Sequence, residues 1–518
     1  MRAIDFFDRG CLLDPNRAFL VDGNSRRTYG EAKVLSHRIG LALQAAGMAH
    51  GDKVAVYSPN DMRAFDCILG LLRGGASWVP LNARNAVPEN AYILDNCDVK
   101  VLFYHSSFED AVAVFRDRCP KIALYVCIDA KGNAGPWLDD FIAGHTGEVP
   151  FVRENPDDLW ALMSSGGTTG RPKGIQLTNL VFETMTMSML AHMPAKKPPV
   201  HLVAAPMTHA AGGIMSVLMA IGTTNVMMPG VKFPDLMQNI ERHGVTYMFL
   251  PPTAIYVTLA QPDVRRYDYS SLEYFIYGAA PMSVDKLREA VEVFGPCMAQ
   301  LYGQTEAPAF CTFLSPQEHV DALAPGGKAQ RLYSCGRPTL NVPVEILDDD
   351  ARIVPRGERG EICVRGNLVM TGYYRNPQAT AEVSAPGGWH RTGDIGYQDE
   401  DGYIYIVDRK KDMIISGGFN IYPSEIEQVV WGHPSVQDCA VIGVPDEKWG
   451  EAVKAVIELK PGATATEDEI MALCKAELGS VKTPKSVEFW DALPRSAVGK
   501  VLKKDIRATF WSGQSRQV

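Results

Sequence analysis

The sequence predicts an α/β protein with a large layered N-terminal domain and a small α+β C-terminal domain. Helix-like and strand-like segments alternate through the first 150 residues, which is typical of layered α/β structure with a largely parallel sheet. Between about residues 335 and 407 the pattern becomes β-rich, and we expect a barrel-like part there. Five charged residues, 408–412, then separate two apolar stretches and mark a domain boundary.

The elements of the first half are predicted from their apolar periodicity. An amphipathic helix is expected after Tyr29, and a second helix is expected at residues 64–72. Strands are expected at residues 53–57, 76–81, 99–104 and 122–127. Prolines and glycines interrupt the long uncharged run 200–231, which therefore predicts a buried helix and a buried strand and not a membrane span.

A glycine-rich segment, residues 163–174, combines glycines and hydroxyl side chains with Arg171 and Lys173. Glycines let backbone N–H groups approach an anion closely, and the cations add positive charge, so the segment suits phosphate. The flanking residues 159–163 and 175–178 are strand-like, which predicts a strand–loop–strand unit that holds a triphosphate. The spacing is not that of a P-loop, because no Gly-Lys-Ser/Thr follows a glycine at the required distance.

Three further predicted strands end in small or special residues. The strands are expected at 247–250, 274–277 and 298–301, and they are followed by Pro251-Pro252, by residues 278–281 and by residues 302–306. Ligands of parallel α/β sheets bind at the carboxyl ends of the strands. These segments therefore predict where the ligand site lies.

The C-terminal part has its own α+β pattern. Ser424 with Glu427, and Thr466 with Glu469, have the spacing of capping boxes, so we expect a helix to begin at each pair. Strands are expected at residues 439–443, 453–459 and 486–490. Together they predict a separate unit of about one hundred residues.

Composition excludes several classes of protein. With 46% hydrophobic and 21% charged residues, the 518-residue chain fits a globular protein with a large core. Its net charge of −9 argues against a nucleic-acid partner. The eleven cysteines include no Cys-x-x-Cys pair, which favours reduced thiols in a cytoplasmic protein over disulfides or a zinc site. The N-terminal residues do not have the pattern of a signal peptide.

Five more motifs follow the glycine-rich segment: Tyr302-Gly-Gln-Thr-Glu306, Thr392-Gly-Asp394, Asp408-Arg409, Gly417-Gly-Phe-Asn-Ile-Tyr-Pro423 and Pro494-Arg-Ser-Ala-Val-Gly-Lys500. In this order the chain resembles the adenylate-forming enzymes, which include acyl- and aryl-CoA synthetases, luciferases and the adenylation domains of peptide synthetases. The resemblance covers nearly the whole chain. It implies an N-terminal domain, residues 1–410, that binds ATP and an acid, and a mobile lid domain, residues 411–518, with its hinge near Lys411.

The resemblance also implies an ATP-dependent acid–CoA ligase. Such an enzyme joins a carboxylic acid to AMP with release of pyrophosphate, and then transfers the acyl group to coenzyme A. ATP and coenzyme A are the expected cosubstrates, and Mg²⁺ is the expected ion. We expect an aromatic acid or a medium- or long-chain fatty acid, because nothing here resembles the tryptophan-closed pocket of acetate-activating relatives.

Individual residues receive roles from the same resemblance. The implied catalytic residues are Lys500, Thr305 and Glu306, and Glu306 is also the implied ligand of Mg²⁺, which prefers hard oxygen donors. The phosphates are expected at Ser165, Gly166, Thr168, Thr169 and Lys173. The adenosine is expected at Gly278, Ala279, Ala280, Pro281, Tyr302, Gly303, Asp394 and Arg409. Coenzyme A is expected at Gly417, Gly418, Trp449 and Arg84, and the acid at His209, Tyr277, Gly278 and Gly303.

Two other functions remain open. A free-standing carrier protein could replace coenzyme A as the acyl acceptor. The glycine-rich loop could also belong to a non-catalytic nucleotide-binding regulator, which would release no pyrophosphate and need no Lys500. The presence of Glu306, Asp394 and Lys500 together favours an enzyme. The expected partners are the acid, ATP and coenzyme A, with no nucleic acid and no integral membrane segment, and the sequence leaves a homodimer open.

Overall fold

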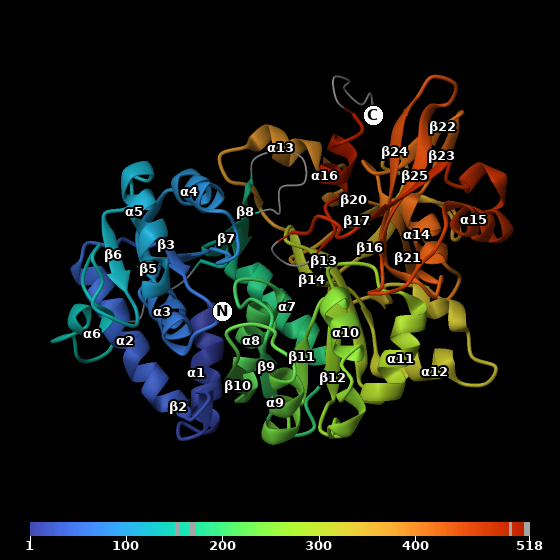
Figure 1. Cartoon of the computed structure of the whole chain (residues 1–518). Coiled ribbons are helices and arrows are strands. Elements are labelled where there is room, and N and C mark those ends of the chain that lie inside the picture. Colours follow the sequence, from blue (N-terminus) through green and yellow to red (C-terminus); the bar gives the residue numbers. More distant parts are fainter. Residues whose placement is uncertain (151–154, 165–171, 497–499, 512–518) are drawn as a thin grey trace.

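The computed structural model describes residues 1–150, 155–164, 172–496 and 500–511 (Figure 1). These residues form a large N-terminal domain and a smaller C-terminal domain, which confirms the predicted α/β class and two-domain architecture. Within the described residues the large domain contains three sheets and the small domain one.

The first sheet crosses the middle of the large domain. Its strands are, in spatial order, β15 (Arg337–Pro338), β14 (Ala307–Leu314), β13 (Met298–Gln304), β12 (Tyr274–Gly278), β11 (Tyr247–Phe249), β9 (Val200–Val203), β10 (Thr224–Met227), β1 (Ala18–Asp22) and β2 (Ser25–Thr28). The strands from β13 to β1 are parallel, and β14, β15 and β2 add antiparallel edges. The carboxyl ends of β11, β12 and β13 therefore meet at one side of the sheet, as predicted.

The second sheet contains the strands predicted on both sides of the glycine-rich segment. Its order is β18 (Gly372–Tyr373), β8 (Gly174–Thr178), β7 (Leu159–Ser164), β4 (Ser77–Pro80), β3 (Lys53–Tyr57), β5 (Val99–Tyr104) and β6 (Leu124–Cys127). β7 and β8 pair antiparallel, with Ser164 opposite Gly174, so the strand–loop–strand prediction is confirmed for the described strands. Thr178 caps the helix that follows, with its side chain accepting from the Val181 N–H.

Helices fill the space between these two sheets and cover their outer faces. The inner layer contains α1 (Ala3–Leu13), α2 (Tyr29–Ala45), α3 (Met62–Arg73), α7 (Asn179–His192) and α8 (Ala210–Leu218). The outer layers are α9 (Asp235–His243), α10 (Pro252–Leu259) and α11 (Val284–Phe294) on the first sheet, and α4 (Val87–Asn96) and α5 (Glu109–Arg118) on the second. The short helices α6 (Leu138–Phe141), α12 (Pro316–Leu323) and α13 (Pro377–Glu382) lie in connections.

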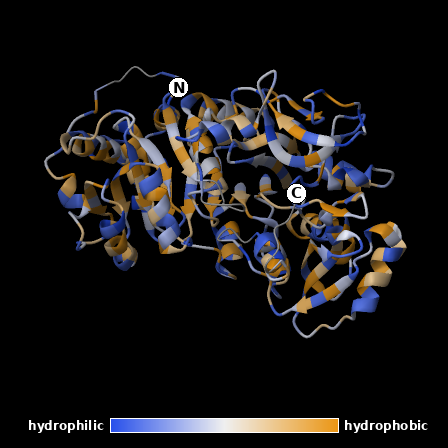
Figure 2. Cartoon of the chain, turned by 90° about the horizontal axis from the view of Figure 1, so that it is seen from above, coloured by the Kyte–Doolittle hydropathy of each residue, from blue (hydrophilic) through white to orange (hydrophobic). Residues whose placement is uncertain are grey.

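Strand β3 shows why the strands of this domain are so apolar. Val54 and Val56 belong to the core between the sheets, whereas Ala55 and Tyr57 belong to the core under α4 and α5. Successive side chains of a strand point to opposite faces, so a strand covered on both faces is apolar throughout. Hydrophobic colour accordingly runs along strands and helices in the interior of the large domain (Figure 2).

The third sheet joins the large domain to the small one. It contains β16 (Val344–Leu347), β17 (Gly360–Val364), β20 (Trp389–Gln398) and β19 (Ser384–Ala385), with β21 (Ile404–Arg409) paired to β20. The predicted β-rich region is thus confirmed. β21 ends at the charged run 408–412, and the chain then enters the small domain.

The small domain is a five-stranded sheet, in the described residues, packed on helices. Its strands are β23 (Phe419–Ile421), β22 (Ile414–Ser416), β25 (Gly450–Leu459), β24 (Val436–Asp446) and β26 (Ser486–Trp490). Its helices are α14 (Pro423–Trp431), α15 (Glu467–Lys482) and α16 (Lys503–Ala508). The predicted capping box of Thr466 and Glu469 is present at the start of α15.

The predicted capping box of Ser424 and Glu427 is wrong. Tyr422 is the N-cap of α14 and makes no side-chain capping bond. The Ser424 hydroxyl instead donates to the Val407 carbonyl, and Glu427 is 4% exposed and accepts from the Val441 N–H at 2.7 Å. Ser424 and Glu427 have the spacing of a capping box, but both side chains form their hydrogen bonds with residues outside α14.

Two element boundaries also differ from the sequence prediction. Strand β13 continues through Gln304 and turns at Thr305 and Glu306 into β14, so the motif 302–306 forms a hairpin. Helix α8, the buried helix predicted within the run 200–231, begins at Ala210, before the Gly212-Gly213 pair. Gly212 permits this early start, because a Cβ there would meet the Met207 carbonyl oxygen at 1.6 Å.

None of the helices in the described part of the chain is long and apolar enough to cross a membrane. The eleven cysteines all lie in described residues, and each is buried and free.

Candidate active site

Three of the predicted residues meet where the first and third sheets join. Asp394 lies in β20 directly opposite Arg409 of β21. Arg409 Nε is 2.6 Å from Asp394 Oδ1, and the Tyr302 hydroxyl donates to Asp394 Oδ2 at 2.7 Å. The carboxylate is 3% exposed, and its negative charge raises the pKa of the Arg409 guanidinium. Each carboxylate oxygen has a second lone pair, so Asp394 can still accept a bond from a ligand hydroxyl.

The tip of the β13–β14 hairpin lies next to the end of the glycine-rich segment. The Tyr373 hydroxyl donates to Glu306 Oε1 at 2.8 Å, and Lys173 Nζ lies 4.7 Å from the centre of the Tyr373 ring. Pairing of β18 with β8 places Tyr373 opposite Ile175 and hence close to Lys173. Sequence reasoning missed Tyr373, because nothing local distinguishes it from a core tyrosine.

The Glu306 carboxylate is a suitable protein ligand for the Mg²⁺ of a magnesium nucleotide. The described residues contain no group of three or more His, Cys, Asp or Glu side chains that could enclose a metal ion. Mg²⁺ is commonly held by one or two carboxylates together with water and substrate phosphates. A single carboxylate beside Lys173 matches that mode of binding.

The ends of β12 and β13 form an exposed backbone surface. Ala279 has φ of +66°, and Ala279 and Pro281 are exposed while Ala280 is half-buried. At Gly278 a Cβ would meet the Leu301 carbonyl oxygen at 2.5 Å, and at Gly303 it would meet the Ala309 nitrogen at 2.5 Å. Only glycine therefore allows these strands to approach so closely, and Ala279 keeps a conformation that costs a non-glycine residue about 1 kcal/mol or more.

Lys500 reaches this region from the small domain. The Ser496 N–H donates to the Lys500 carbonyl at 2.7 Å, and the Lys500 N–H donates to Ser496 Oγ at 3.1 Å, so these two residues are bound to each other. Burial and the positive charge of Arg409 together lower the pKa of the Lys500 ammonium to about 8, against the opposing effect of the Asp394 carboxylate. The small domain thus brings Lys500 within the electrostatic reach of Asp394 and Arg409.

His209 and Tyr277, which were both predicted to bind the acid, lie in different surroundings. His209 is exposed and shares a hydrogen bond with Thr208 Oγ1 at 3.0 Å, yet surrounding protein lowers the pKa of its imidazole to about 4. Tyr277 is 1% exposed, and its hydroxyl lies 2.9 Å from His319 Nε2 and 3.2 Å from Gln300 Oε1. Because its side chain is in the core under α10 and α11, the expectation that Tyr277 lines the acid site is corrected.

The residues expected at coenzyme A are apart from Asp394. Gly417 and Gly418 form the two-residue turn between β22 and β23, with φ of +57° and +81°, as a type I′ hairpin turn requires. The Gly417 N–H donates to the Trp449 carbonyl at 2.9 Å. Figure 1 shows β22 and β23 on the side of the small domain that is turned away from β13. Phe419 and Trp449 are 58% and 41% exposed at this hairpin.

Arg84 is exposed on the large domain and lines a cavity of about 370 Å³ between the two domains. Pro206, Pro251 and Tyr256 contribute from the large domain, and Asp438 and Arg495 contribute from the small one. The structure therefore brings Lys500, Asp394, Arg409, Tyr302 and Glu306 to one region, and Trp449 is not among the described residues that line the cavity of Arg84.

Replacing Gly417 by alanine is expected to destabilise the hairpin more than replacing Gly418. Both substitutions place a side chain at positive φ, which costs about 1 kcal/mol. A Cβ at Gly417 would also meet Trp449 Cε3 at 2.6 Å, whereas nothing lies within 4 Å of one at Gly418. Denaturant unfolding compares the two variants, and equal losses in the free energy of unfolding would show that Trp449 simply moves aside.

Four predicted phosphate ligands, Ser165, Gly166, Thr168 and Thr169, lie outside the described residues. Strands β7 and β8, on either side of these four residues, are described, and so is Lys173.

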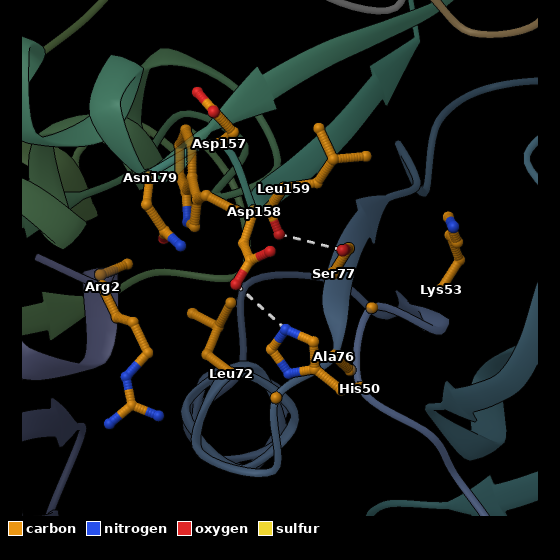
Figure 3. Close-up of a pocket in the computed structure, with 14 residues that line it drawn as sticks. Arg2, His50, Lys53, Leu72, Ala76, Ser77, Asp157, Asp158, Leu159 and Asn179 are labelled. Carbon is orange, nitrogen blue, oxygen red and sulfur yellow. Dashed lines mark hydrogen bonds and ion pairs between the residues drawn. The ribbon is translucent and has the colours of Figure 1, made fainter. Parts of the chain in front are cut away.

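A second cavity, of about 260 Å³, lies elsewhere in the large domain (Figure 3). Lys53, Ser77 and Leu159, the first residues of β3, β4 and β7, are among the residues that line it. His50 and Asp158 face each other across 3.0 Å at its wall. It thus lies at the amino ends of these strands, whereas Ser164 lies at the carboxyl end of β7, and we do not assign the cavity to the active site.

Comparison with protein families gives two matches. The family described as AMP-binding enzyme matches residues 7–374, and the family described as AMP-binding enzyme C-terminal domain matches residues 425–500. The two matches lie in the large and the small domain, respectively.

Relatives of known name are similar over nearly their whole length. A medium/long-chain-fatty-acid–CoA ligase, FadD8 of Mycobacterium tuberculosis, is 34% identical over 97% of this chain and 89% of its own. A feruloyl-CoA synthase of an Amycolatopsis species is 35% identical over 97% of this chain and 98% of its own. Among solved structures, the amide bond synthetase McbA from Marinactinospora thermotolerans has a TM-score of 0.89 and 30% identity, and covers 98% of this chain and 100% of its own.

Proposed function

Since the chain belongs to the AMP-binding enzyme family and is an AMP-forming acyl-CoA synthetase, we propose that it activates an aromatic acid or a medium- or long-chain fatty acid. The observation that carries the proposal is the approach of Lys500, from the small domain, to Asp394 and Arg409 of the large one. The first half-reaction needs such a lysine cation, close to the carboxylate that is proposed to bind the adenosine.

In this proposal the large domain holds the nucleotide. Asp394 accepts from the ribose hydroxyls with Arg409 beside it, and Tyr302 with residues 278–281 surrounds the adenine. Thr305 and Lys500 hold the α-phosphate, while Lys173 and the loop residues Ser165, Gly166, Thr168 and Thr169 hold the terminal phosphates. Glu306, oriented by the Tyr373 hydroxyl at 2.8 Å, provides the protein ligand of Mg²⁺. When bound, that ion neutralises charge on the phosphates.

Positioning and charge neutralisation account for catalysis in this arrangement. A carboxylate is a poor electrophile because oxide is its leaving group, and a mixed anhydride with AMP removes that obstacle. The acid oxygen attacks the α-phosphorus in line with the departing pyrophosphate, and negative charge shifts onto the phosphate oxygens. Fixed cations placed there before the reaction lower its barrier.

The lowered pKa of Lys500 predicts a pH limit for adenylation. A lysine with a pKa of about 8 is charged below that pH and loses its charge as the pH rises through it. The ratio kcat/KM for ATP, which reports the free enzyme, is therefore expected to fall above about pH 8. Lys500→Arg removes this limit because a guanidinium stays charged. A wild-type profile that stays flat to about pH 10 would contradict the role of the Lys500 charge.

For the acid, His209 is exposed at the start of α8. The names of the relatives, a medium/long-chain-fatty-acid–CoA ligase and a feruloyl-CoA synthase, point to the same two classes of acid. Gly278, Gly303 and His209 are the proposed contacts.

The second half-reaction is proposed to follow a rotation of the lid domain, residues 411–518, about Lys411. Rotation would carry the hairpin of Gly417 and Gly418, with Trp449, toward the adenylate and toward Arg84. The free and buried cysteines support a reducing compartment, the cytoplasm, as the place of this reaction.

The proposal is tested by pyrophosphate release from MgATP with a panel of benzoates, hydroxycinnamates and short- to long-chain fatty acids, each with and without coenzyme A. Sustained release with one acid class that depends on coenzyme A, together with formation of the thioester, is the expected result. Absence of release with every acid would overturn the proposed substrate classes.

A second possible function differs from the first in the molecule that accepts the acyl group. The McbA structure, with 30% identity, is named an amide bond synthetase, so relatives of this fold are named for different acceptors. A single slow turnover with coenzyme A, restored by a carrier protein bearing phosphopantetheine or by an amine, would move the acceptor away from coenzyme A.

A further inference from the structure

A group of charged residues next to Lys500 has no part in the chemistry described so far. Lys503 Nζ lies 2.8 Å from Glu427 Oε1, and the charges of Asp408 and Asp412 also act on Lys503. Lys503 is the first residue of α16, Glu427 lies in α14, and the two aspartates lie at the end of β21 and just beyond it. We refer to these four residues as the Lys503 cluster.

The Lys503 cluster is buried and remains charged at its centre. The side chains of Lys503 and Glu427 are 19% and 5% exposed, and Asp408 is 6% exposed. Burial alone would lower the pKa of Lys503, but the three carboxylates outweigh it and raise this pKa. Burial raises the pKa of Glu427 to about 7, so the acids compete for one ammonium. Lys503 is thus held as a fixed cation.

The cluster joins the lid to the strand that leads into it. Asp408 Oδ2 accepts from the Ser424 N–H at 2.8 Å, and Asp408 Oδ1 accepts from the Arg409 N–H at 2.7 Å. On the other side of Lys411, Asp412 Oδ1 lies 2.9 Å from Arg507 Nη2 of α16. Asp408 precedes the proposed hinge, whereas Glu427 and Lys503 follow it. Rotation about Lys411 would therefore change the distance from Asp408 to Lys503.

The cluster also fixes one end of the loop that carries Lys500. The Leu502 N–H donates to the Pro494 carbonyl at 2.8 Å, which closes the base of this loop. At the first end, Arg495 forms ion pairs with Asp438 at 2.8 Å and Glu458 at 3.1 Å. At the second end, Lys503 is bound by Glu427. Both ends of the loop are thus fixed by charge pairs to the body of the lid.

From this geometry we propose that Lys503 is a positioning residue, which holds Lys500 at the α-phosphate during adenylation by binding Glu427 beside Asp408. The inference rests on the proposed function, because it presumes that Lys500 acts in the first half-reaction. It predicts a role in that half-reaction alone, since Asp408 precedes the proposed hinge and binds the Ser424 N–H of the lid in this position of the lid.

The test uses the full-length variants Lys503→Met, Lys503→Arg and Glu427→Gln, with Lys504→Met as the matched control. Lys504 is the neighbouring lysine, and it is exposed. Lys503→Met is expected to lower the rate of acid-dependent pyrophosphate release by about 10- to 100-fold, as small misplacements of catalytic groups do. Thioester formation from supplied acyl-AMP and coenzyme A should be unchanged. Lys503→Arg should recover most of the rate, and Lys504→Met should match the wild type.

Hydrogen exchange of residues 494–502 gives a second readout that does not depend on activity. Faster exchange of this segment in Lys503→Met and Glu427→Gln than in Lys504→Met is the expected result. Equal exchange in all variants, or equal losses in both half-reactions, would overturn the positioning role. A failure of the proposed function gives a different result, because the wild-type protein would then release no pyrophosphate with any acid. In that case the comparison of hydrogen exchange still decides whether Lys503 positions the segment.

Discussion

Replacement of Lys500 by alanine is expected to lower the rate of acyl-adenylate formation by about 100- to 1,000-fold, the loss typical for one preorganised group that stabilises transition-state charge. In the structure Lys500 is half-buried, and its ammonium is under the influence of Arg409 and Asp394. The substitution removes a cation from the place where charge develops on the α-phosphate.

The measurement separates the two half-reactions. Pyrophosphate release from MgATP and the acid reports the first, and thioester formation from supplied acyl-AMP and coenzyme A reports the second. Lys500→Ala should lose the first and keep the second, and Lys504→Ala, at an exposed neighbour, should keep both. Equal losses in the two assays would contradict a role for Lys500 that is restricted to adenylation.

Replacement of Lys411 by proline is expected to have the opposite effect. The Asp412 N–H donates to the Arg409 carbonyl at 2.9 Å, so Lys411 is the third residue of a turn between the domains. Its φ is not positive, and proline would fix φ and restrict the residue before it. Because the lid must then turn about a stiff backbone, thioester formation should fall about 100-fold, while adenylation should fall much less.

Lys411→Ala is the matched control, since it removes the same side chain and leaves the backbone free. Its rates in both half-reactions should stay near those of the wild type. Unchanged coenzyme A transfer in Lys411→Pro would reject the hinge at this residue. If both Lys411 variants lose coenzyme A transfer equally, the side chain matters and the backbone does not.

Local pattern was sufficient for most of the fold. The strands at residues 53–57, 99–104 and 486–490 have the bounds that their apolar residues predict. The last three residues of the first two strands are buried on both faces of the sheet and are therefore apolar without interruption. The capping pair Thr466 and Glu469 lies on an exposed helix start, where local bonds decide the outcome. At Ser424 and Glu427 the same spacing failed, because burial under β21 and α16 offers both side chains stronger partners.

The candidate site shows the same difference between residues that local motifs predict and residues that only tertiary contacts reveal. Motifs identified Asp394, Arg409 and Tyr302, which the structure joins by hydrogen bonds. Tyr373 beside Glu306 could not be found in the sequence, because only the pairing of β18 with β8 brings it there. Tyr277 was misassigned for the converse reason. It lies at the carboxyl end of β12, next to Gly278, but strand alternation turns its side chain into the core under α10 and α11.

The burial of all eleven cysteines has a practical consequence for measuring lid rotation. Burial raises the pKa of every one of these thiols, so the reactive thiolate is scarce as well as inaccessible. A maleimide dye should therefore leave the native protein largely unlabelled. Two cysteines introduced at exposed positions, one on each domain, would accept a donor and an acceptor fluorophore without removal of any native thiol. The energy transfer between them could then follow the lid through a single turnover in otherwise unaltered protein.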